Sequence, residues 1–357
     1  MIAKSKPIQV GVIGSGTIAR SHVNAYQESG RAQVLGVVDV DEARAEALAE
    51  AFGVPHAFRD YHELLKLDEV EAVSICTPND LHAPMTIDTL RSGKHVLCEK
   101  PMAINVEAAT QMEQAAETYR RVLMIAFFNR FRDDSHALKW MIQAGALGEI
   151  YHVAISMIRR RGIPSLGSWF TRKERSGGGT LIDSGCHVLD LALWLMGFPQ
   201  PETVSACTYA KFGNRDDYLY LHMWGGAPQD TPKFDVEDYA TAFVRFAGGA
   251  SMAIECSWAA NAKDSFYIDL LGTRGGARLD HDQDLEIYTE HHGHLADLKP
   301  LYKKTDPFLE EIDHFLDRIT GVEAEPLCTP EEGVVVQQII EAVYTSADRG
   351  REVEVKT

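Results

Sequence analysis

The sequence predicts a two-domain α/β protein, in which a doubly wound parallel sheet is followed by an α+β domain with a large, mostly antiparallel sheet. Three observations lead to this prediction. The chain has 357 residues, more than one ordinary core holds. Its first third alternates short apolar runs with helical patterns, whereas its later strands are longer and joined as hairpins. We place the boundary near residue 128, which gives a first domain over residues 1–128 and a second over 129–357.

The first domain is built from buried strands that alternate with helices. The runs predicted as strands are residues 8–13, 34–39, 72–76, 95–98 and 122–126. Helical patterns follow from about Thr17 and over Glu42–Phe52, and again after the third and fourth strands. Strands that are apolar on both faces are typical of a parallel sheet covered by helices on both sides.

The second domain begins with a predicted helix over Ser135–Ala144 and continues with hairpins. The predicted hairpins pair residues 243–246 with 251–254 and residues 266–272 with 277–280. A last helix has clear end signals, with Thr329 as N-cap, Pro330 at its first position, Glu332 completing a capping box and Gly350 as the stop.

Composition excludes several classes of partner. The net charge of −17 argues against nucleic acid and anionic membranes. We interpret Arg159–Arg161 as solvated charge, with an anion or substrate contact as the alternative. No apolar run approaches the ~20 residues of a membrane helix. Because residues 1–7 contain no apolar signal region, we expect a cytoplasmic protein.

Cysteine and histidine patterns do not predict a metal site. The six cysteines are scattered without a C-x-x-C pair, so we expect reduced and mostly buried thiols. His291-His292-Gly293-His294 lies in a polar stretch without a metal-binding motif, and we interpret it as a surface turn. We therefore expect no metal.

A glycine-rich turn follows the first predicted strand. Residues 14–19, Gly14-Ser15-Gly16-Thr17-Ile18-Ala19, fit the pattern G-x-G-x-x-G/A of a Rossmann dinucleotide site. Gly14 would allow the tight turn, Gly16 would let the backbone approach a pyrophosphate, and Ala19 would let the helix pack on the strand. Asp39 ends the second strand, where a carboxylate accepts hydrogen bonds from the adenosine ribose and repels a 2′-phosphate. The sequence thus favours NAD over NADP, with Arg44 as the one nearby cation.

Two further positions carry candidate chemistry. Lys100 comes just after a strand, at the sheet edge where doubly wound folds bind ligands, although an exposed lysine before a proline is an equal alternative. Asp183, His187 and Asp190 are spaced i, i+4, i+7 on one helix face. The Asp-His pair among them is either structural or catalytic, and the preceding Gly177-Gly178-Gly179 would free the helix start to line a cavity.

Several motifs together resemble the glucose–fructose oxidoreductase / inositol dehydrogenase (Gfo/Idh/MocA) family. They are Thr77-Pro78-Asn79 with His82, Cys98-Glu99-Lys100-Pro101, Asn129-Arg130-Phe131, the stretch from Gly177 to Asp190, Val236-Glu237-Asp238-Tyr239-Ala240 and Gly272-Thr273-Arg274-Gly275-Gly276. The resemblance covers nearly the whole chain in the right order. Residues 213–235 depart from it and are interpreted as an insertion or variable loop.

The resemblance implies roles for particular residues. It makes Lys100 the group that polarises the reacting oxygen, His187 the general base, and Asp183 a substrate ligand or the residue that orients this network. It also places Thr17, Ile18, Thr77, Pro78, Asn79, His82, Glu99 and Lys100 at the cofactor. Arg130 either contacts substrate or bridges the domains, and Trp169 either stacks on a sugar ring or anchors its loop. Asp190 is interpreted as structural.

The resulting hypothesis is an NAD-dependent oxidoreductase that transfers a hydride between a secondary hydroxyl of a cyclic sugar or polyol and nicotinamide. The absence of any Tyr-x-x-x-Lys sequence argues against a short-chain dehydrogenase. Two alternatives from the same resemblance stay open: an NAD-dependent glycoside hydrolase and a sugar-sensing regulator without catalysis. An open face of the antiparallel sheet suggests a homodimer or homotetramer.

Overall fold

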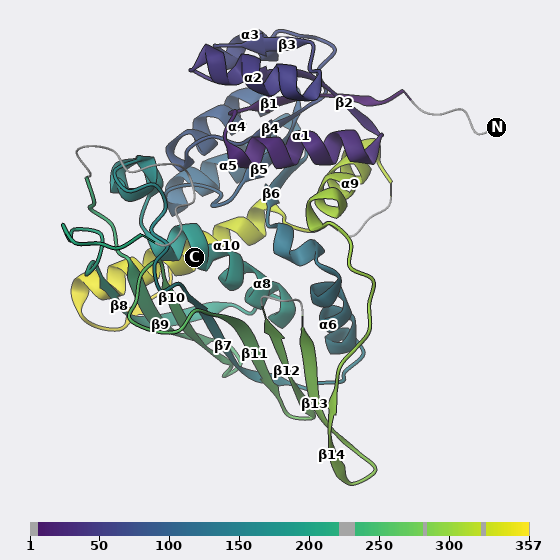
Figure 1. The fold of residues 1–357 in the computed structure, drawn as a ribbon. Coiled ribbons are helices and arrows are strands. Elements are labelled where there is room, and N and C mark those ends of the chain that lie inside the picture. Colours follow the sequence, from purple (N-terminus) through teal and green to yellow (C-terminus); the bar gives the residue numbers. More distant parts are fainter. Residues whose placement is uncertain (1–5, 221–232, 281–283, 323–325, 357) are drawn as a thin grey trace. The chain divides into compact units, whose positions relative to one another are not determined.

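The computed structural model describes residues 6–220, 233–280, 284–322 and 326–356 (Figure 1). Most of the interpreted insertion, residues 221–232, therefore lies outside the described residues. The chain divides into two compact units. The first contains the chain up to residue 103, residues 107–131 and residues 305–334, and the second contains residues 104–106, 132–304 and 335–357.

The first unit is a six-stranded parallel sheet with the order β3-β2-β1-β4-β5-β6. Its elements are β1 (Ile8–Ile13), α1 (Thr17–Ser29), β2 (Ala32–Val38), α2 (Glu42–Phe52), β3 (His56–Phe58), α3 (Tyr61–Leu65), β4 (Ala72–Ile75), α4 (His82–Arg91), β5 (His95–Glu99), α5 (Val106–Tyr119), β6 (Leu123–Ala126) and α9 (Pro307–Thr320). All residues of β1, β4 and β6 are buried, as expected for strands covered on both faces. The predicted doubly wound sheet is confirmed, and β3 and α3 are additions to it.

The first unit also includes a segment from near the C-terminus, whereas the prediction assigned all residues after 128 to the second domain. Helix α9 lies against α1. The Arg31 guanidinium pairs with the Asp317 carboxylate at 2.5 Å and with Asp313 at 3.4 Å. These contacts join positions almost 290 residues apart, so no local pattern announces them.

The second unit is a nine-stranded sheet with the order β14-β13-β12-β11-β7-β10-β9-β8-β15. Its elements are α6 (Asp133–Gln143), β7 (Ile150–Ile158), α7 (Lys173–Ser176), α8 (Cys186–Met196), β8 (Pro201–Tyr209), β9 (Tyr239–Phe246), β10 (Ser251–Ser257), β11 (Ser265–Gly272), β12 (Gly275–Asp280), β13 (Leu285–His291), β14 (His294–Leu298) and β15 (Val353–Glu354). Neighbouring strands are antiparallel except for the parallel pair β7–β10. The predicted α+β domain with a mostly antiparallel sheet is confirmed.

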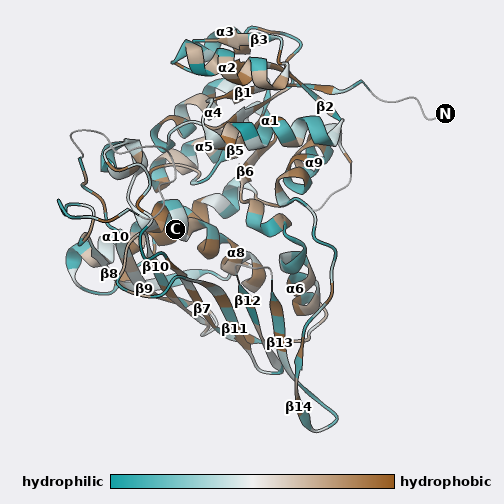
Figure 2. Ribbon diagram, viewed as in Figure 1, coloured by the Kyte–Doolittle hydropathy of each residue, from teal (hydrophilic) through white to brown (hydrophobic). Residues whose placement is uncertain are grey.

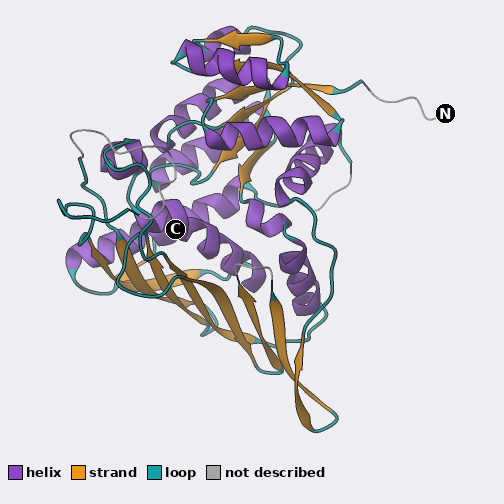
Figure 3. Ribbon diagram, viewed as in Figure 1, coloured by secondary structure: helices purple, strands orange, loops and turns teal. Residues whose placement is uncertain are grey.

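Helices cover one face of the nine-stranded sheet (Figure 3). Helix α8 is apolar along most of its length and lies against β7 (Figure 2). The strands alternate accordingly: Val244, Ile155 and Ile268 are buried, whereas Phe243, Leu271 and Tyr288 on the opposite face are exposed. The second face of the sheet therefore carries exposed apolar side chains.

The last helix, α10 (Pro330–Arg349), begins in the first unit and ends in the second. Its capping box is present: the Thr329 N–H donates to Glu332 Oε2 at 3.0 Å, and the Glu332 N–H lies 3.3 Å from Thr329 Oγ1. The predicted start of this helix is confirmed, because the signal is local and needs no tertiary partner.

The remaining sequence predictions concern the histidine-rich turn, the cysteines, metal binding and membrane-spanning helices. His292 and Gly293 form the turn between β13 and β14, both with positive φ, as expected for a surface hairpin. All six cysteines are free thiols and only Cys207 is exposed. Within the described ranges there is no cluster of metal-binding side chains and no helix long and apolar enough to cross a bilayer.

Candidate active site

The turn between β1 and α1 requires its first glycine. Gly14 has φ +101°, and a Cβ there would lie 2.3 Å from the Cys76 carbonyl oxygen. Gly16 is the N-cap of α1, and a Cβ on it would meet nothing, so a ligand has room to approach the backbone. Ala19 is fully buried, which lets α1 pack closely on the sheet. Each small residue thus has the physical role that the dinucleotide motif predicts.

The start of α1 fits the pyrophosphate of a dinucleotide. No side chain caps this helix, and its first turn contains no acidic residue, so its amide groups are left to an anion. In the part of the chain that the structure describes, the buried hydroxyls of Ser15 and Thr77 have no hydrogen-bond partner. Thr17 is exposed and Ile18 partly exposed beside them. The residues present therefore fit the group that the motif predicts.

Asp39 is held at the end of β2 by two backbone amides. The Ser15 N–H donates to Oδ2 and the Asp41 N–H donates to Oδ1, both at 3.0 Å. The carboxylate is thereby tied to the glycine-rich turn itself, as a ribose ligand must be. Arg44, the one nearby cation that could have favoured a 2′-phosphate, pairs with Asp41 at 3.3 Å.

Lys100 follows β5 and is half-buried, with its backbone held by the preceding residue. The Lys100 N–H donates to Glu99 Oε2 at 3.1 Å. Glu99 Oε1 lies 2.9 Å from Nε2 of the buried His22, whose Nδ1 lies 3.1 Å from Ser74 Oγ. Both oxygens of Glu99 thus have partners, the His22 ring and the Lys100 amide, and the contact of Glu99 with the cofactor stays a prediction. Glu99 positions the backbone of Lys100, and sequence reasoning missed His22 as its partner.

The loop after β4 contains four predicted cofactor residues. Pro78 is partly exposed, whereas Asn79 and His82 are buried. His82 Nδ1 lies 2.8 Å from the Pro101 carbonyl oxygen and Nε2 lies 2.9 Å from that of Thr77. Burial lowers the pKa of His82, and the hydrogen bonds to Pro101 and Thr77 oppose this effect. One ring nitrogen thus faces the carbonyl oxygen of Pro101, next to Lys100, and the other faces that of Thr77, while a contact of His82 with the cofactor stays a prediction.

The two lesser substrate candidates have structural contacts. Arg130 is fully buried, and its guanidinium pairs with Glu332 of the α10 capping box at 2.6 Å. A buried ion pair within the first unit accounts for this arginine without a substrate. The Trp169 ring stacks on that of its neighbour Phe170, with centroids 3.7 Å apart, a contact within its own loop. A contact of either residue with substrate stays a prediction.

Asp183 and His187 lie at the start of the α8 helix, which differs from the regular helix that we predicted. Residues Leu181–Gly185 form a π-helical turn that continues into α8 at Cys186. Such wide turns are frequent at functional sites, because they change the direction of a side chain within a helix. Asp183 is nearly buried, His187 is partly exposed and Asp190 is fully buried. The burial of Asp190 agrees with its interpretation as structural.

A buried glutamate caps this helix. Glu237 Oε2 accepts a hydrogen bond from the Gly179 N–H at 2.8 Å, and Oε1 accepts from the Leu181 N–H and the Tyr344 hydroxyl, each at 3.0 Å. Burial raises the pKa of Glu237, while these three hydrogen bonds lower it. A carboxylate at a helix N-terminus is favourable because it satisfies exposed amides and opposes the helix dipole.

The glycines before the helix are needed for a different reason from the one we expected. A Cβ on Gly179 would lie 1.9 Å from the Glu237 carbonyl oxygen, and one on Gly178 would lie 2.1 Å from the Tyr344 hydroxyl. They are therefore required by close packing of the capping glutamate and tyrosine, not by freedom to line a cavity. The glycine run was the available signal that a neighbour approaches closely, and sequence reasoning did not identify that neighbour as Glu237.

The Asp183 carboxylate has a fixed orientation. Its Oδ2 accepts hydrogen bonds from the Ser184 hydroxyl at 2.9 Å and from the Trp258 indole N–H at 3.0 Å. Hydrogen bonds to a carboxylate are stronger than those between neutral groups, so this oxygen is firmly held. Trp258 was not among the predicted site residues, because nothing near it in sequence connects it with Asp183.

The predicted catalytic residues are divided between the two units. Lys100 and the dinucleotide turn belong to the first unit, whereas Asp183 and His187 belong to the second. Each half is internally ordered: the first by His22, Glu99 and His82, the second by Glu237 and Trp258. Sequence motifs found the candidate residues, and the structure adds the buried groups that hold them.

Comparison with known proteins agrees with this arrangement. Residues 8–127 match the model of an oxidoreductase family with an NAD-binding Rossmann fold, and residues 135–278 match the GFO/IDH/MocA C-terminal domain. The chain is 32% identical over 354 residues to the D-glucoside 3-dehydrogenase of Escherichia coli K12, covering 98% of both chains. It is 26% identical to the myo-inositol 2-dehydrogenase of Thermotoga maritima, covering 98% of this chain and 99% of the other. An NAD-binding oxidoreductase from Klebsiella pneumoniae has the same fold, with a TM-score of 0.84, 25% identity and coverage of 99% and 100%.

Proposed function

Because the chain belongs to the Gfo/Idh/MocA family of oxidoreductases with an NAD-binding Rossmann fold, we propose that it is an NAD-dependent dehydrogenase of a secondary hydroxyl in a cyclic sugar or polyol. Asp183 and His187 carry this proposal. A carboxylate oriented by two donors lies one helical turn before a partly exposed imidazole. Relatives with sugar and inositol substrates support the substrate class.

The proposed mechanism gives each of the three residues one task. The Lys100 ammonium hydrogen-bonds the reacting oxygen and stabilises its negative charge. His187 removes the hydroxyl proton, for which an unperturbed pKa of ~6.5 is well suited. Asp183 accepts a hydrogen bond from the sugar or orients the imidazole. NAD, when bound, is the acceptor for the hydride that the carbinol carbon gives up.

Residues of the first unit are proposed to hold the cofactor. The amides at the start of α1, from Gly16 onward, bind the pyrophosphate, and Asp39 accepts hydrogen bonds from the adenosine ribose. The unpartnered hydroxyls of Ser15 and Thr77 are available for further hydrogen bonds in the same turn and the adjoining loop. Glu99 and His82 also contact the backbone at Lys100 and Pro101 beside this predicted cofactor site.

A substrate screen tests the proposal. NADH formation is followed at 340 nm with methyl α-D-glucoside, myo-inositol, free aldoses and an anhydrosugar, using Lys100→Met as the inactive control. We expect reduction of NAD with at least one of these compounds and none with the variant. Glycoside cleavage without net NADH would identify a hydrolase instead, and sugar binding without turnover would identify a regulator.

The open sheet face supports a homo-oligomer. Strand register places Tyr209, Phe243, Leu271 and Tyr288 on one face of the nine-stranded sheet, and all four are at least a third exposed. Exposed aromatic and aliphatic side chains over several strands are typical of protein interfaces. We propose a homodimer or homotetramer formed through this face in the cytoplasm, and light scattering of the wild type and a Phe243→Glu variant tests the assembly.

A further inference from the structure

Trp258 is the largest fully buried side chain among the residues that the structure describes. It directly follows β10, and its backbone N–H donates to the Asp238 carbonyl oxygen at 2.9 Å. Its indole N–H lies 3.0 Å from Asp183 Oδ2 and 3.2 Å from Ser184 Oγ. The Ser184 hydroxyl donates to the same Asp183 oxygen. One indole N–H and one hydroxyl therefore converge on a single oxygen of the Asp183 carboxylate, the candidate substrate ligand.

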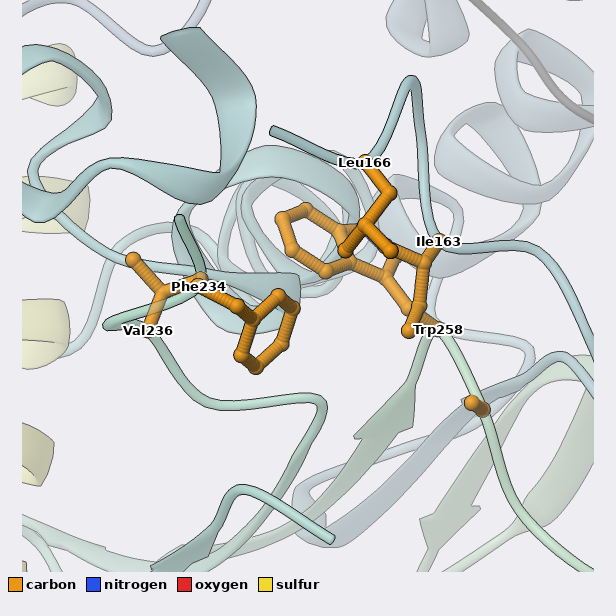
Figure 4. Packing of buried hydrophobic residues seen from close by; sticks show 6 residues of the cluster. Ile163, Leu166, Phe234, Val236 and Trp258 are labelled. Atoms are coloured by element: carbon orange, nitrogen blue, oxygen red, sulfur yellow. The ribbon is translucent and has the colours of Figure 1, made fainter. Parts of the chain in front are cut away.

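The indole is held in place by an apolar cluster around it (Figure 4). The buried members of this cluster are Ile163, Leu166, Phe234, Val236, Trp258 and Ala259. Two of them come from the loop after β7, which also carries Trp169, and two come from the segment just before Glu237. A ring packed in this way cannot turn its N–H to another acceptor without displacing its neighbours. The direction of the hydrogen bond to Asp183 is thus set by packing.

This geometry points to a function beyond packing, since a carboxylate can rotate about its own Cβ–Cγ bond. With two donors fixed on Oδ2, that rotation is suppressed and the position of Oδ1 is defined. A substrate hydroxyl or an imidazole that needs an acceptor then meets it without reorganisation. Replacing a tryptophan that served only as core by phenylalanine would lower stability but leave sugar recognition unchanged.

We propose that Trp258 is a positioning residue that orients the Asp183 carboxylate and couples it to the loop carrying Trp169. The inference rests on the proposed role of Asp183 in substrate binding. Trp258 contacts this loop through the cluster that it shares with Ile163 and Leu166. The residue acts through Asp183 and does not itself need to contact substrate.

The test is Trp258→Phe, which keeps an aromatic ring and removes the indole N–H. We expect kcat/KM for the sugar to fall by roughly 10- to 100-fold, the size of a lost hydrogen bond to a charged group. The probe is methyl α-D-glucoside, or the sugar that the screen above selects. The Kd for NADH, measured by fluorescence, should stay near the wild-type value, and Trp140→Phe, at a 70% exposed tryptophan, should change neither quantity.

Ser184→Ala provides a second variant in case Trp258→Phe does not fold, because it removes the other donor to the same oxygen.

The effect of each variant on the sugar affinity of the NADH-bound enzyme is compared in the wild-type and Asp183→Asn backgrounds. If Trp258 acts through Asp183, Trp258→Phe weakens sugar binding in the wild-type background and has no further effect in the Asp183→Asn background. Equal effects in both, or a lower Tm with unchanged kcat/KM, would overturn the inference. A fully active Asp183→Asn variant would instead refute the proposed role of Asp183, and this inference with it, whereas a wild type that reduces no NAD with any sugar of the screen would refute the proposed function itself.

Discussion

Replacing the buried Glu237 tests the account of how the α8 helix is positioned. In Glu237→Ala, the Gly179 and Leu181 amides and the Tyr344 hydroxyl all lose their acceptor. Each unsatisfied buried donor costs about 1–3 kcal/mol. Because water can enter the space left by the carboxyl group, we expect the lower part of the summed range, about 3–5 kcal/mol of unfolding free energy.

Two milder substitutions should lower the unfolding free energy by smaller amounts. Glu237→Gln keeps an oxygen for Leu181 and Tyr344 but turns its NH₂ group toward the Gly179 amide, and should cost about 1–3 kcal/mol. Tyr344→Phe removes one donor and leaves the carboxylate with two, and should cost about 1 kcal/mol. The expected order of destabilisation is therefore Ala, then Gln, then the tyrosine variant.

Urea denaturation measures the global change, and hydrogen exchange of the Gly179 and Leu181 amides measures the local one. Glu255→Gln is the matched control, since the exposed Glu255 also accepts a hydrogen bond from a tyrosine, Tyr239. It should change stability by less than about 0.5 kcal/mol. A Glu237→Ala protein as stable as wild type, or a control variant that is equally destabilised, would refute the capping argument.

Three further predictions follow from the same structure. Asp39→Ala should narrow the preference for NAD over NADP, because it removes the carboxylate that repels a 2′-phosphate. The preference is measured as kcat/KM with each cofactor, and a wild-type enzyme that prefers NADP would contradict the assignment of Asp39. His187→Ala should lower kcat by roughly 100- to 10,000-fold and flatten the acid limb of sugar oxidation; an unchanged pH profile would make the histidine structural. Burial, with a smaller contribution from Arg121, lowers the pKa of His95 to about 4, and its Nδ1 accepts the Val122 N–H at 2.9 Å, as a neutral ring must. Since the unfolded chain binds this proton near pH 6.5, stability should fall as pH drops from 6.5 to 4, and His95→Gln should lessen that fall in urea titrations.

The fold followed from the sequence wherever its signal was local. β1 is buried at every residue and α10 starts with a capping box four residues long, so both could be predicted from short windows. Segments β3 and α3 were missed because three and five residues are too short for a clear period. The placement of α9 against α1 depends on contacts from Arg31 to Asp313 and Asp317, which no window includes.

The candidate site divides in the same way. Motifs identified Gly14, Asp39, Lys100 and Asp183, because each follows a strand or a glycine run in a recognisable spacing. The groups that orient them are distant in sequence: Trp258 is 75 residues from Asp183, and His22 is 77 residues from Glu99. The amide of Leu181, the first residue of the π-helical turn, is likewise bound by Glu237, 56 residues away. Motifs therefore locate reacting groups, whereas their orientation is a tertiary property.

Isotope transfer is the most direct test of the proposed dehydrogenase activity. Methyl α-D-glucoside with deuterium on every ring carbon is incubated with the enzyme and NAD, and the nicotinamide product is analysed by mass spectrometry. We predict NADH that carries a single deuterium, formed by the wild type and not by Lys100→Met. If the sugar binds but no labelled NADH appears with this glucoside or with the equivalently labelled sugars of the screen, the protein is not the dehydrogenase proposed here.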